Sequence, residues 1–524
     1  MKRARLILVI LLVAAVSLFF SLFPHWHAFK NSPEGYAFSG QASWFDPWDI
    51  NVYWAAIRWG QDHGFLMANM YDSHPNPPIL YYPLYTTTGW LFKNTQPALL
   101  FYSLSIITSL ILATVVVIIC YKLFRDTLST FFTSLVIALG GGLGFMVAPH
   151  SNSLDLSMTS FTFHSAWQRP HEALALASYL VALIAIYQLL KNKQLIWVVI
   201  SVLSLIVTLV FYPYYLLSWF LIVGLAVILW RSQLNVKTVI VLGSISIFGA
   251  AITWLMYFNL SLNPSFTGVV TQTLTNPTIP SLLLGYGVLI LAPVAGLFYL
   301  PKLTQLEKFL LGWIWISLAL SFLPLGIARF YLRGLFMPIV LLNILLLKKL
   351  CKQYLPQQAK SMFKMCLVSL LILTSMSNWA IFYTRIQEVD AFNPWYYFTQ
   401  EEEEALKFID QELPSNSTFL SAYHIGNHLP AFTSAQVFFG HLIQTPNAKQ
   451  RSQQVARFYS WSMSEQEAVQ FLQTNHVKYV YLGREEREFV NAEKDGSLTV
   501  SLSRLPFLEK IYQNQLVEIY QLTE

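Results

Sequence analysis

Two aspartates, Asp46 and Asp49, stand in the segment DPWDINVYWAAIRWGQDHG, which follows the first long apolar run of the chain. Residues three apart on a helix share a face. A carboxylate held at the edge of a membrane can accept the proton of an acceptor hydroxyl as it attacks an activated sugar. In the structural alternative, Asp46 caps the helix and Asp49 pairs with Arg58. We take both as candidate catalytic residues, and we expect Asp62 and Asp72 to be solvated loop residues.

A second polar cluster lies in the segment FTFHSAWQRPHEALALASYL, which opens a later apolar run. Pro170 and Glu172 are ordinary residues for the first turn of a helix. Together with His164, Arg169 and His171 they are nevertheless unusually polar for such an apolar chain, and they could bind a sugar, a phosphate or a divalent metal ion. The spacing HxxxxxxH matches no metal motif, so we assign these residues to substrate binding and name no metal ligand.

Two arginines, Arg329 and Arg333, occur four residues apart in the segment IARFYLRG. The planar guanidinium group suits phosphate oxygens, and the start of the helix that follows adds a partial positive charge. The alternative is contact with anionic lipid headgroups at the membrane surface. We predict that one of the two binds a substrate phosphate, with Arg333 as the first choice.

The composition predicts a membrane protein. Of the 524 residues 55% are hydrophobic and 11% are charged, and the mean hydropathy is +0.49, whereas a soluble protein carries about 25% charged residues. The deficit is expected if lipid solvates much of the surface. The net charge of +6 is spread among loops rather than along one face, so we predict no nucleic-acid partner.

Apolar runs of about 20 residues predict roughly eleven membrane-spanning helices. The first run is longer than a signal peptide core and no small-residue cleavage site follows it, so we expect it to be retained. The runs are 6–23, 97–121, 129–148, 171–190, 194–211, 213–230, 238–259, 281–300, 309–326, 333–349 and 365–384.

Lysine and arginine are concentrated in alternate loops, which orients the chain in the membrane. We predict a multi-pass plasma-membrane protein with a cytoplasmic N-terminus. The loop 24–96 and the chain after about residue 385 then lie outside the cytoplasm. Residues 1–385 form the predicted membrane domain and residues 386–524 a soluble domain.

The soluble region is predicted to be α/β. Helices are expected in EEEEALKFIDQELP, NAKQRSQQVARFYSW and SEQEAVQFLQTN, and strands in STFLSA, AQVFFG, VKYVYLG and the hairpin IYQNQLVEIYQL. In the loop 24–96, Ile50, Tyr53, Trp54 and Ile57 recur at helical spacing, which predicts a helix lying on the membrane interface. His424, Asn427, His428 and His441 could bind saccharide, but we favour satisfied surface polar groups. The predicted fold class is therefore a mainly α polytopic membrane protein with a small α/β C-terminal domain.

These features together resemble the GT-C superfamily of membrane glycosyltransferases, which use polyprenyl-phosphate sugars. The resemblance rests on the aspartates of the first outer loop, the stretch DINVYWAAIRWGQDHG…YDSHPNPPILYYPLY, the PHEALAL helix start and the soluble C-terminal region. It covers most of the chain. The Asp-Glu pair of the arabinose- and mannose-transferring branches is replaced by DPWD, so the resemblance maps the catalytic carboxylate to Asp49 or Asp46.

The resemblance implies transfer of a hexosyl or pentosyl group, with inversion, from a polyprenyl-phosphate donor in the membrane lipid to a glycan, lipid or protein acceptor of the cell envelope. Arg333 or Arg329 would bind the donor phosphate, and a divalent metal ion is the one candidate cofactor. A transporter or flippase of a lipid-linked sugar is the alternative. Transporters usually carry ionisable residues at mid-membrane, whereas the polar residues here gather at one face.

Overall fold

The computed structural model describes residues 2–147, 153–159, 161–491 and 502–523. The chain divides into two compact units. Unit 1 comprises residues 1–27, 103–257 and 273–387, and unit 2 comprises residues 28–102, 258–272 and 388–524. Most of the predicted outer loop 24–96 therefore groups with the C-terminal region rather than with the membrane helices. The division into domains 1–385 and 386–524 stays a prediction.

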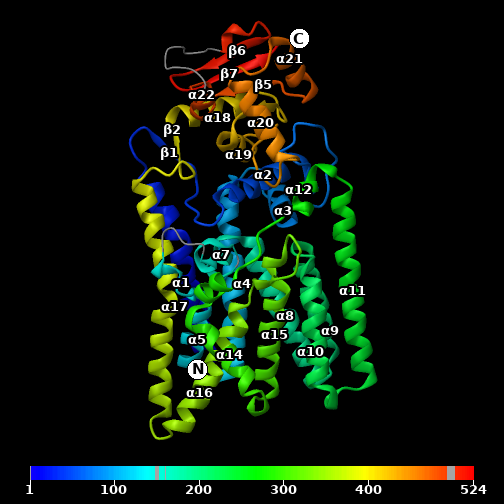
Figure 1. Cartoon of the computed structure of the whole chain (residues 1–524), viewed down its shortest axis with the longest axis vertical. Helices are drawn as coiled ribbons and strands as arrows, with labels where there is room; N and C mark the ends of the chain where they lie inside the picture. Colours follow the sequence, from blue (N-terminus) through cyan, green and yellow to red (C-terminus); the bar gives the residue numbers. More distant parts are fainter. Residues whose placement is uncertain (1, 148–152, 160, 492–501, 524) are drawn as a thin grey trace. The chain divides into compact units, whose positions relative to one another are not determined.

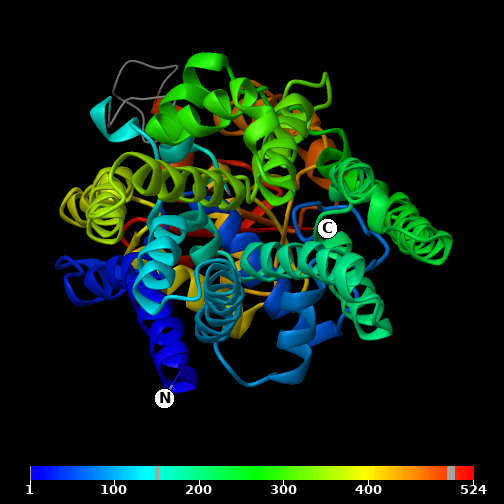
Figure 2. The same ribbon diagram turned by 90° about the horizontal axis from the view of Figure 1, so that it is seen from below.

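Unit 1 is a bundle of apolar helices. Figure 1 shows α8, α9, α10 and α15 side by side, and many helices of the unit are seen nearly end-on in Figure 2. The helices are α1 (Lys2–Lys30), α4 (Pro97–Phe124), α5 (Thr127–Leu139), α6 (Leu154–Ser157), α7 (Phe163–Gln168), α8 (Pro170–Asn192), α9 (Leu195–Phe211), α10 (Tyr215–Leu229), α11 (Val236–Ser261), α13 (Ile279–Tyr286), α14 (Leu291–Phe298), α15 (Gln305–Ser321), α16 (Phe336–Tyr354) and α17 (Ala359–Asp390). Short 3-10 turns η1 (Gly144–Met146), η2 (Arg231–Gln233), η4 (Gly287–Ile290), η5 (Leu300–Lys302) and η6 (Ala328–Leu332) interrupt them.

The bundle has the surface of a membrane protein. Large apolar side chains are exposed along its helices, for example Ile247 at 72% and Phe298 at 80%, a surface that lipid rather than water would solvate. Among the described residues, seven helices are long and apolar enough to cross a membrane, and α5, α9 and α10 are shorter apolar helices. The predicted multi-pass membrane fold is confirmed.

Every predicted apolar run overlaps a helix of unit 1, although the number of eleven crossings stays a prediction. The run 129–148 differs most, because α5 ends at Leu139 and Gly140 follows it in an extended conformation. The last residue of that run lies outside the described residues.

Unit 2 joins segments from distant parts of the chain. Strands β1 and β2 pair antiparallel, with Tyr36 opposite Thr399. The helices of the unit are α2 (Pro47–His63), α3 (Pro83–Leu91), α12 (Thr267–Thr271), α18 (Gln400–Glu412), α19 (Tyr423–Phe432), α20 (Ala448–Tyr459), α21 (Glu465–Thr474) and α22 (Arg484–Asn491), with 3-10 turns η3 (Pro264–Phe266) and η7 (Leu502–Arg504). The strands are β1 (Tyr36–Phe38), β2 (Tyr397–Thr399), β3 (Thr418–Leu420), β4 (Gln436–Val437), β5 (Tyr479–Leu482), β6 (Leu508–Gln513) and β7 (Glu518–Leu522).

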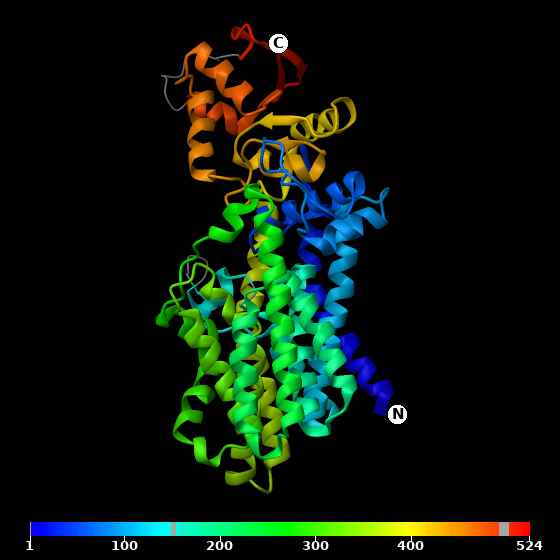
Figure 3. The same ribbon diagram turned by 90° about the vertical axis from the view of Figure 1, so that its right-hand side faces the viewer.

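The second sheet of unit 2 has the strand order β4-β3-β5-β7-β6. Strands β4, β3 and β5 are parallel, and β7 and β6 run antiparallel to their neighbours. Alternate residues point to opposite faces. Leu420 and Val480 pack with α20 and α21, whereas Phe419 and Tyr479 pack with α18 and α19. Figure 3 shows these two helix pairs on opposite sides of the strands. The small α/β region is confirmed.

The helix predicted at DPWDINVYWAAIRWGQDHG is α2, but the alternative that Asp46 caps it and the prediction that it lies on the membrane interface are both wrong. Asp46 has a left-handed backbone conformation with φ 42° and makes no side-chain capping bond. The apolar positions Ile50, Tyr53, Trp54 and Ile57 are at most 3% exposed. They pack inside the protein, so they give α2 no apolar face for lipid.

Candidate functional site

Asp49 lies in the first turn of α2, where the partial positive charge of the helix start favours a carboxylate. Nε2 of His441 lies 3.0 Å from Oδ1 of Asp49. The imidazole is 1% exposed and the Asp49 side chain 24%. Arg58, which the structural alternative paired with Asp49, instead bonds Asp410. Asp49 is therefore a partly accessible carboxylate with a buried hydrogen-bond partner.

The surrounding backbone fixes the tautomer of His441. Its Nδ1 lies 3.1 Å from the backbone nitrogens of both Ile443 and Gln444, which donate to it. A nitrogen that accepts two N–H groups carries no proton, so the hydrogen of the neutral ring is on Nε2. His441 thus donates to Asp49. The bond fixes the direction of the carboxylate.

The charge of Asp49 acts on nearby tyrosine side chains. Burial, with the Asp49 charge as a lesser cause, raises the pKa of Tyr81 to about 12 even though hydrogen bonds with Tyr82 and Gln444 lower it. Burial also raises the pKa of Tyr423, and the charges of Asp49 and Asp46 add to this effect. Because these phenols stay protonated, they can donate hydrogen bonds to a polar ligand.

Polar contacts attach α2 and the loop after it to the C-terminal segments. Nδ2 of Asn51 donates to Oδ1 of Asn427 at 2.7 Å, and both residues are fully buried. Nδ2 of Asn69 donates to the carbonyl oxygen of Gln444 at 2.7 Å. The position of Asp49 relative to His441 therefore depends on both segments.

Asp72 was predicted to be a solvated loop residue, and this is wrong. Its side chain is 8% exposed and pairs with Arg451 at 2.7 Å. Ser265 also donates to it at 2.7 Å. Burial opposes ionisation, but Arg451, Ser265 and the backbone N–H of His74 outweigh it and lower the pKa of Asp72. Asp62, by contrast, is exposed as predicted, but it lies in the last turn of α2 rather than in a loop.

In unit 1 the structure brings together residues predicted from two separate segments. Oε1 of Glu172, in the first turn of α8, lies 3.6 Å from Nη1 of Arg169 and 3.3 Å from Nη2 of Arg333. All three side chains are at most 9% exposed. Two guanidinium groups and one carboxylate leave one net positive charge, which suits an anionic ligand.

Aromatic rings position one of the two arginines of this cluster, Arg333. The guanidinium of Arg333 lies 4.2 Å from the ring centroid of Phe330 and 4.4 Å from that of Tyr212, and it donates to the Tyr214 hydroxyl at 2.5 Å. Stacking on aromatic faces is a preferred environment for arginine. Arg329 contacts the same Phe330 ring at 5.7 Å.

His171 and His164, both predicted to bind substrate, lie beside different residues. The His171 ring lies 6.1 Å from that of Tyr212, so it shares this neighbour with Arg333. His164 is buried on α7, where its Nε2 lies 3.2 Å from the amide nitrogen of Gln168. No group of three or more metal-ligating side chains is found in the part of the chain that the structure describes.

Sequence reasoning placed His441 wrongly, together with Asn427 and His428, which are also buried. His441 was interpreted as a surface polar group, but it is buried and bonded to a candidate catalytic residue. Its partner is 392 positions away in the chain, so no local pattern connects the two. The only sequence signal was a histidine beside the apolar strand AQVFFG.

The chain has the fold of the GT-C superfamily of membrane glycosyltransferases, as comparison with solved structures shows. Two of these structures come from Archaeoglobus fulgidus and Cupriavidus metallidurans. The oligosaccharyltransferase from Archaeoglobus fulgidus, tethered with an acceptor peptide, is 12% identical to this chain and has a TM-score of 0.55. The match covers 91% of this chain and 69% of the oligosaccharyltransferase.

ArnT from Cupriavidus metallidurans, bound to undecaprenyl phosphate, is 10% identical, with 97% of both chains covered and a TM-score of 0.50. The archaeal enzyme is also known in complex with an inhibitory peptide and a dolichol-phosphate, at a TM-score of 0.52. No protein-family model and no curated protein sequence matches the chain.

Proposed function

We propose that this protein is a membrane glycosyltransferase that moves a sugar from a polyprenyl-phosphate donor to an acceptor outside the cytoplasm. The observation that carries the proposal is the partly accessible carboxylate of Asp49, oriented by a neutral imidazole. The fold supports it, since two proteins of the same fold were solved with polyprenyl phosphates. The loop charges favour a cytoplasmic N-terminus and an outer C-terminal region.

In the proposed reaction the acceptor hydroxyl oxygen attacks the anomeric carbon of the sugar. The bond from that carbon to the phosphate oxygen breaks, and its electron pair leaves with the polyprenyl phosphate. Asp49 takes the hydroxyl proton as general base. A single displacement inverts the anomeric configuration. His441 cannot relay this proton, because its Nε2 already carries a hydrogen and its Nδ1 accepts two backbone hydrogen bonds.

The leaving phosphate needs positive charge. Arg333 is the proposed partner, because it is pre-oriented by Phe330 and Tyr212 and because Arg169 adds a second guanidinium beside Glu172. Arg329, His171 and His164 are proposed to contribute to donor binding. Fixed positive groups at a site of developing negative charge stabilise the transition state without reorganisation.

The test is release of undecaprenyl phosphate from undecaprenyl-phosphate-linked hexose and pentose by the purified full chain. We expect Asp49→Asn to lower turnover at least about 100-fold, the usual scale for a general base. Asp46→Asn should retain activity within about 10-fold, because Asn tolerates the left-handed conformation. Asp62→Asn, at an exposed carboxylate on the same helix, is the matched control.

Wild-type turnover in the Asp49→Asn, Asp46→Asn double variant would refute the proposal. Transport of the lipid-linked sugar across a vesicle bilayer without release of undecaprenyl phosphate would instead support a flippase. Arg333→Gln is expected to lower turnover as well, because the leaving phosphate loses its proposed positive partner.

A further inference from the structure

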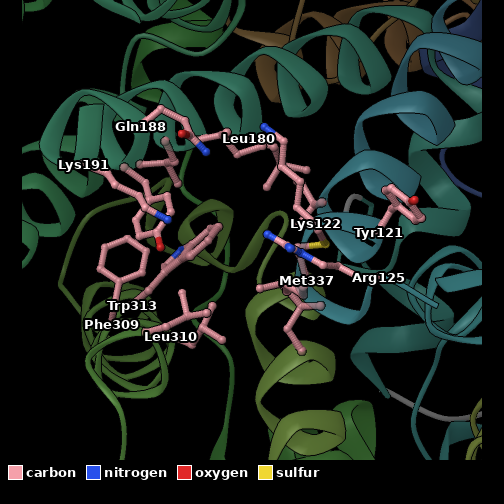
Figure 4. Close-up of a pocket in the computed structure, with 17 residues that line it drawn as sticks. Tyr121, Lys122, Arg125, Leu180, Gln188, Lys191, Phe309, Leu310, Trp313 and Met337 are labelled. Atoms are coloured by element: carbon pink, nitrogen blue, oxygen red, sulfur yellow. The ribbon is translucent and has the colours of Figure 1, made fainter. Parts of the chain in front are cut away.

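A cavity of about 720 Å³ lies within unit 1, and none of the residues assigned above lines it. It is lined by α4 and the residue after its end, by α8, by the first half of α15 and by α16. Its polar members are Tyr121, Lys122, Arg125, Tyr187, Gln188 and Lys191. Figure 4 shows Lys122 and Arg125 on one side of the cavity and Lys191 with Gln188 on the other. The proposed reaction uses none of these residues.

The cavity is cationic at one end and apolar at the other. Lys122, Arg125 and Lys191 are exposed, whereas the lining residues Trp313 and Met337 are buried. None of the residues that line the cavity is an aspartate or a glutamate. An anion at the mouth would therefore meet three positive charges without a competing carboxylate.

The length of the cavity matches one leaflet of a membrane. Along α8 the lining runs from Lys191 at the mouth to Leu180 at depth. At 1.5 Å per residue this rise is about 16 Å, close to half of the roughly 30 Å hydrocarbon core. The cavity thus has a charged mouth and a one-leaflet apolar depth, which are the dimensions of a lipid with an anionic head.

We propose that this cavity binds an anionic phospholipid, with the phosphate at Lys122, Arg125 and Lys191 and an acyl chain beside Trp313 and Met337. A soluble anion would leave the apolar depth empty, and a neutral lipid would leave the three cations without a counter-charge. The charged mouth is distant from the Arg333 cluster, because the rise from Lys191 to Glu172 along α8 is about 28 Å. The proposal does not depend on sugar transfer.

Native mass spectrometry of the purified full chain tests the proposal, with phosphatidylglycerol, phosphatidylcholine of the same acyl chains, and inorganic phosphate as probes. We expect phosphatidylglycerol to bind at least tenfold more tightly than phosphatidylcholine. Inorganic phosphate should not displace it at equal concentration. Displacement by inorganic phosphate would show a site for a free anion and would overturn the proposal.

Two kinds of variant locate the binding. The triple variant Lys122→Gln, Arg125→Gln, Lys191→Gln should lose the preference for phosphatidylglycerol at least tenfold. The control Lys302→Gln, Lys352→Gln, Lys360→Gln removes the same charge from exposed positions outside the cavity and should keep the preference. An equal loss in both variants would mean that only overall charge matters, and it would overturn the proposal.

A steric variant tests the acyl-chain part without changing charge. Met337→Trp fills the buried end of the cavity and should weaken phosphatidylglycerol binding at least tenfold while the mouth stays intact. Unchanged binding in a variant that elutes as the wild type does would overturn the placement of the chain. If this variant fails to fold, the charge variants still decide the proposal.

Discussion

Nε2 of His441 donates a hydrogen bond to Oδ1 of Asp49 across 3.0 Å, although 392 positions separate the two residues in the chain. The bond joins the first turn of α2 to the segment that follows β4. It makes His441 a positioning residue for the proposed base, since the ring holds the carboxylate and leaves the acceptor proton to it.

Loss of the imidazole should weaken the base without abolishing it. We expect His441→Ala to lower turnover about 10- to 100-fold with little change in KM, because the carboxylate is no longer oriented. Turnover and KM, measured on the purified full chain, check this.

A conservative substitution of His441 distinguishes a role in orienting Asp49 from a role in folding. His441→Gln retains an N–H donor and should recover part of the lost turnover, while His63→Gln, at an exposed histidine on α2, should behave as the wild type does. Equal losses of turnover in His441→Ala and His441→Gln would show that the residue is only structural.

The Asp72–Arg451 pair should make stability depend on pH. The pKa of Asp72 is lowered from its usual 3.8, so the folded state binds fewer protons than the unfolded state just below that value. The stabilisation is present above pH 3.8 and is lost as pH falls through the lower folded value. Asp72→Asn should cost about 3 kcal/mol at neutral pH, because it leaves Arg451 buried without its counter-charge.

Thermal unfolding of the full chain in detergent, followed by tryptophan fluorescence at a series of pH values, measures this difference. The difference in unfolding midpoint between the wild type and Asp72→Asn should be constant from neutral pH to about pH 5. It should disappear in more acidic solution. Asp62→Asn is the control at an exposed carboxylate. If this difference in midpoint widened on acidification, the direction assigned to the pKa shift of Asp72 would be wrong.

The sequence predicted the parts of the fold that arise from local periodicity. Apolar runs located the helices of unit 1, and alternating patterns located strands such as β5 and β7. Pro170 and Glu172 marked the start of α8. These features depend on residues near one another in the chain, which is why one sequence suffices to find them.

Side-chain contacts between residues far apart in the sequence could not be predicted from local patterns. Asp72 looked like a loop residue because Arg451 and Ser265, which bury and neutralise it, come from two other segments. Asp46 looked like a helix cap, but its left-handed backbone precludes the usual extended capping conformation. The cluster of Arg169, Glu172 and Arg333 was foreseen residue by residue, whereas their contact was not.

Close packing of α2 against α3 depends on two glycines. A Cβ at Gly60 would overlap the carbonyl oxygen of Thr86, and one at Gly89 would overlap that of Ile57. Because both obstacles are backbone atoms, they cannot move aside cheaply. Gly60→Ala should therefore destabilise unit 2 by about 2 kcal/mol, within the range for overpacking.

The apparent unfolding midpoint of the full chain measures this effect. Gly224→Ala on α10 is the control, since nothing lies within 4 Å of the added carbon. It should leave the midpoint unchanged or raise it slightly, because alanine favours a helix more than glycine does. Equal midpoints for Gly60→Ala and the wild type would contradict the close approach of the two helices.

Glu172 should be needed for stability as well as for the proposed donor site, because it separates two buried guanidinium groups. Glu172→Ala leaves Arg169 and Arg333 as buried like charges and should cost about 3 kcal/mol. Adding Arg169→Met removes one of those charges, so the double variant should recover part of the loss, and a double-mutant cycle on the unfolding midpoint measures the coupling. Glu403→Ala removes an exposed carboxylate paired with Lys407 and should leave the midpoint almost unchanged. Strictly additive effects of Glu172→Ala and Arg169→Met on the midpoint would mean that the two charges do not interact. The net positive charge of the cluster would then no longer support the proposed binding of the donor phosphate.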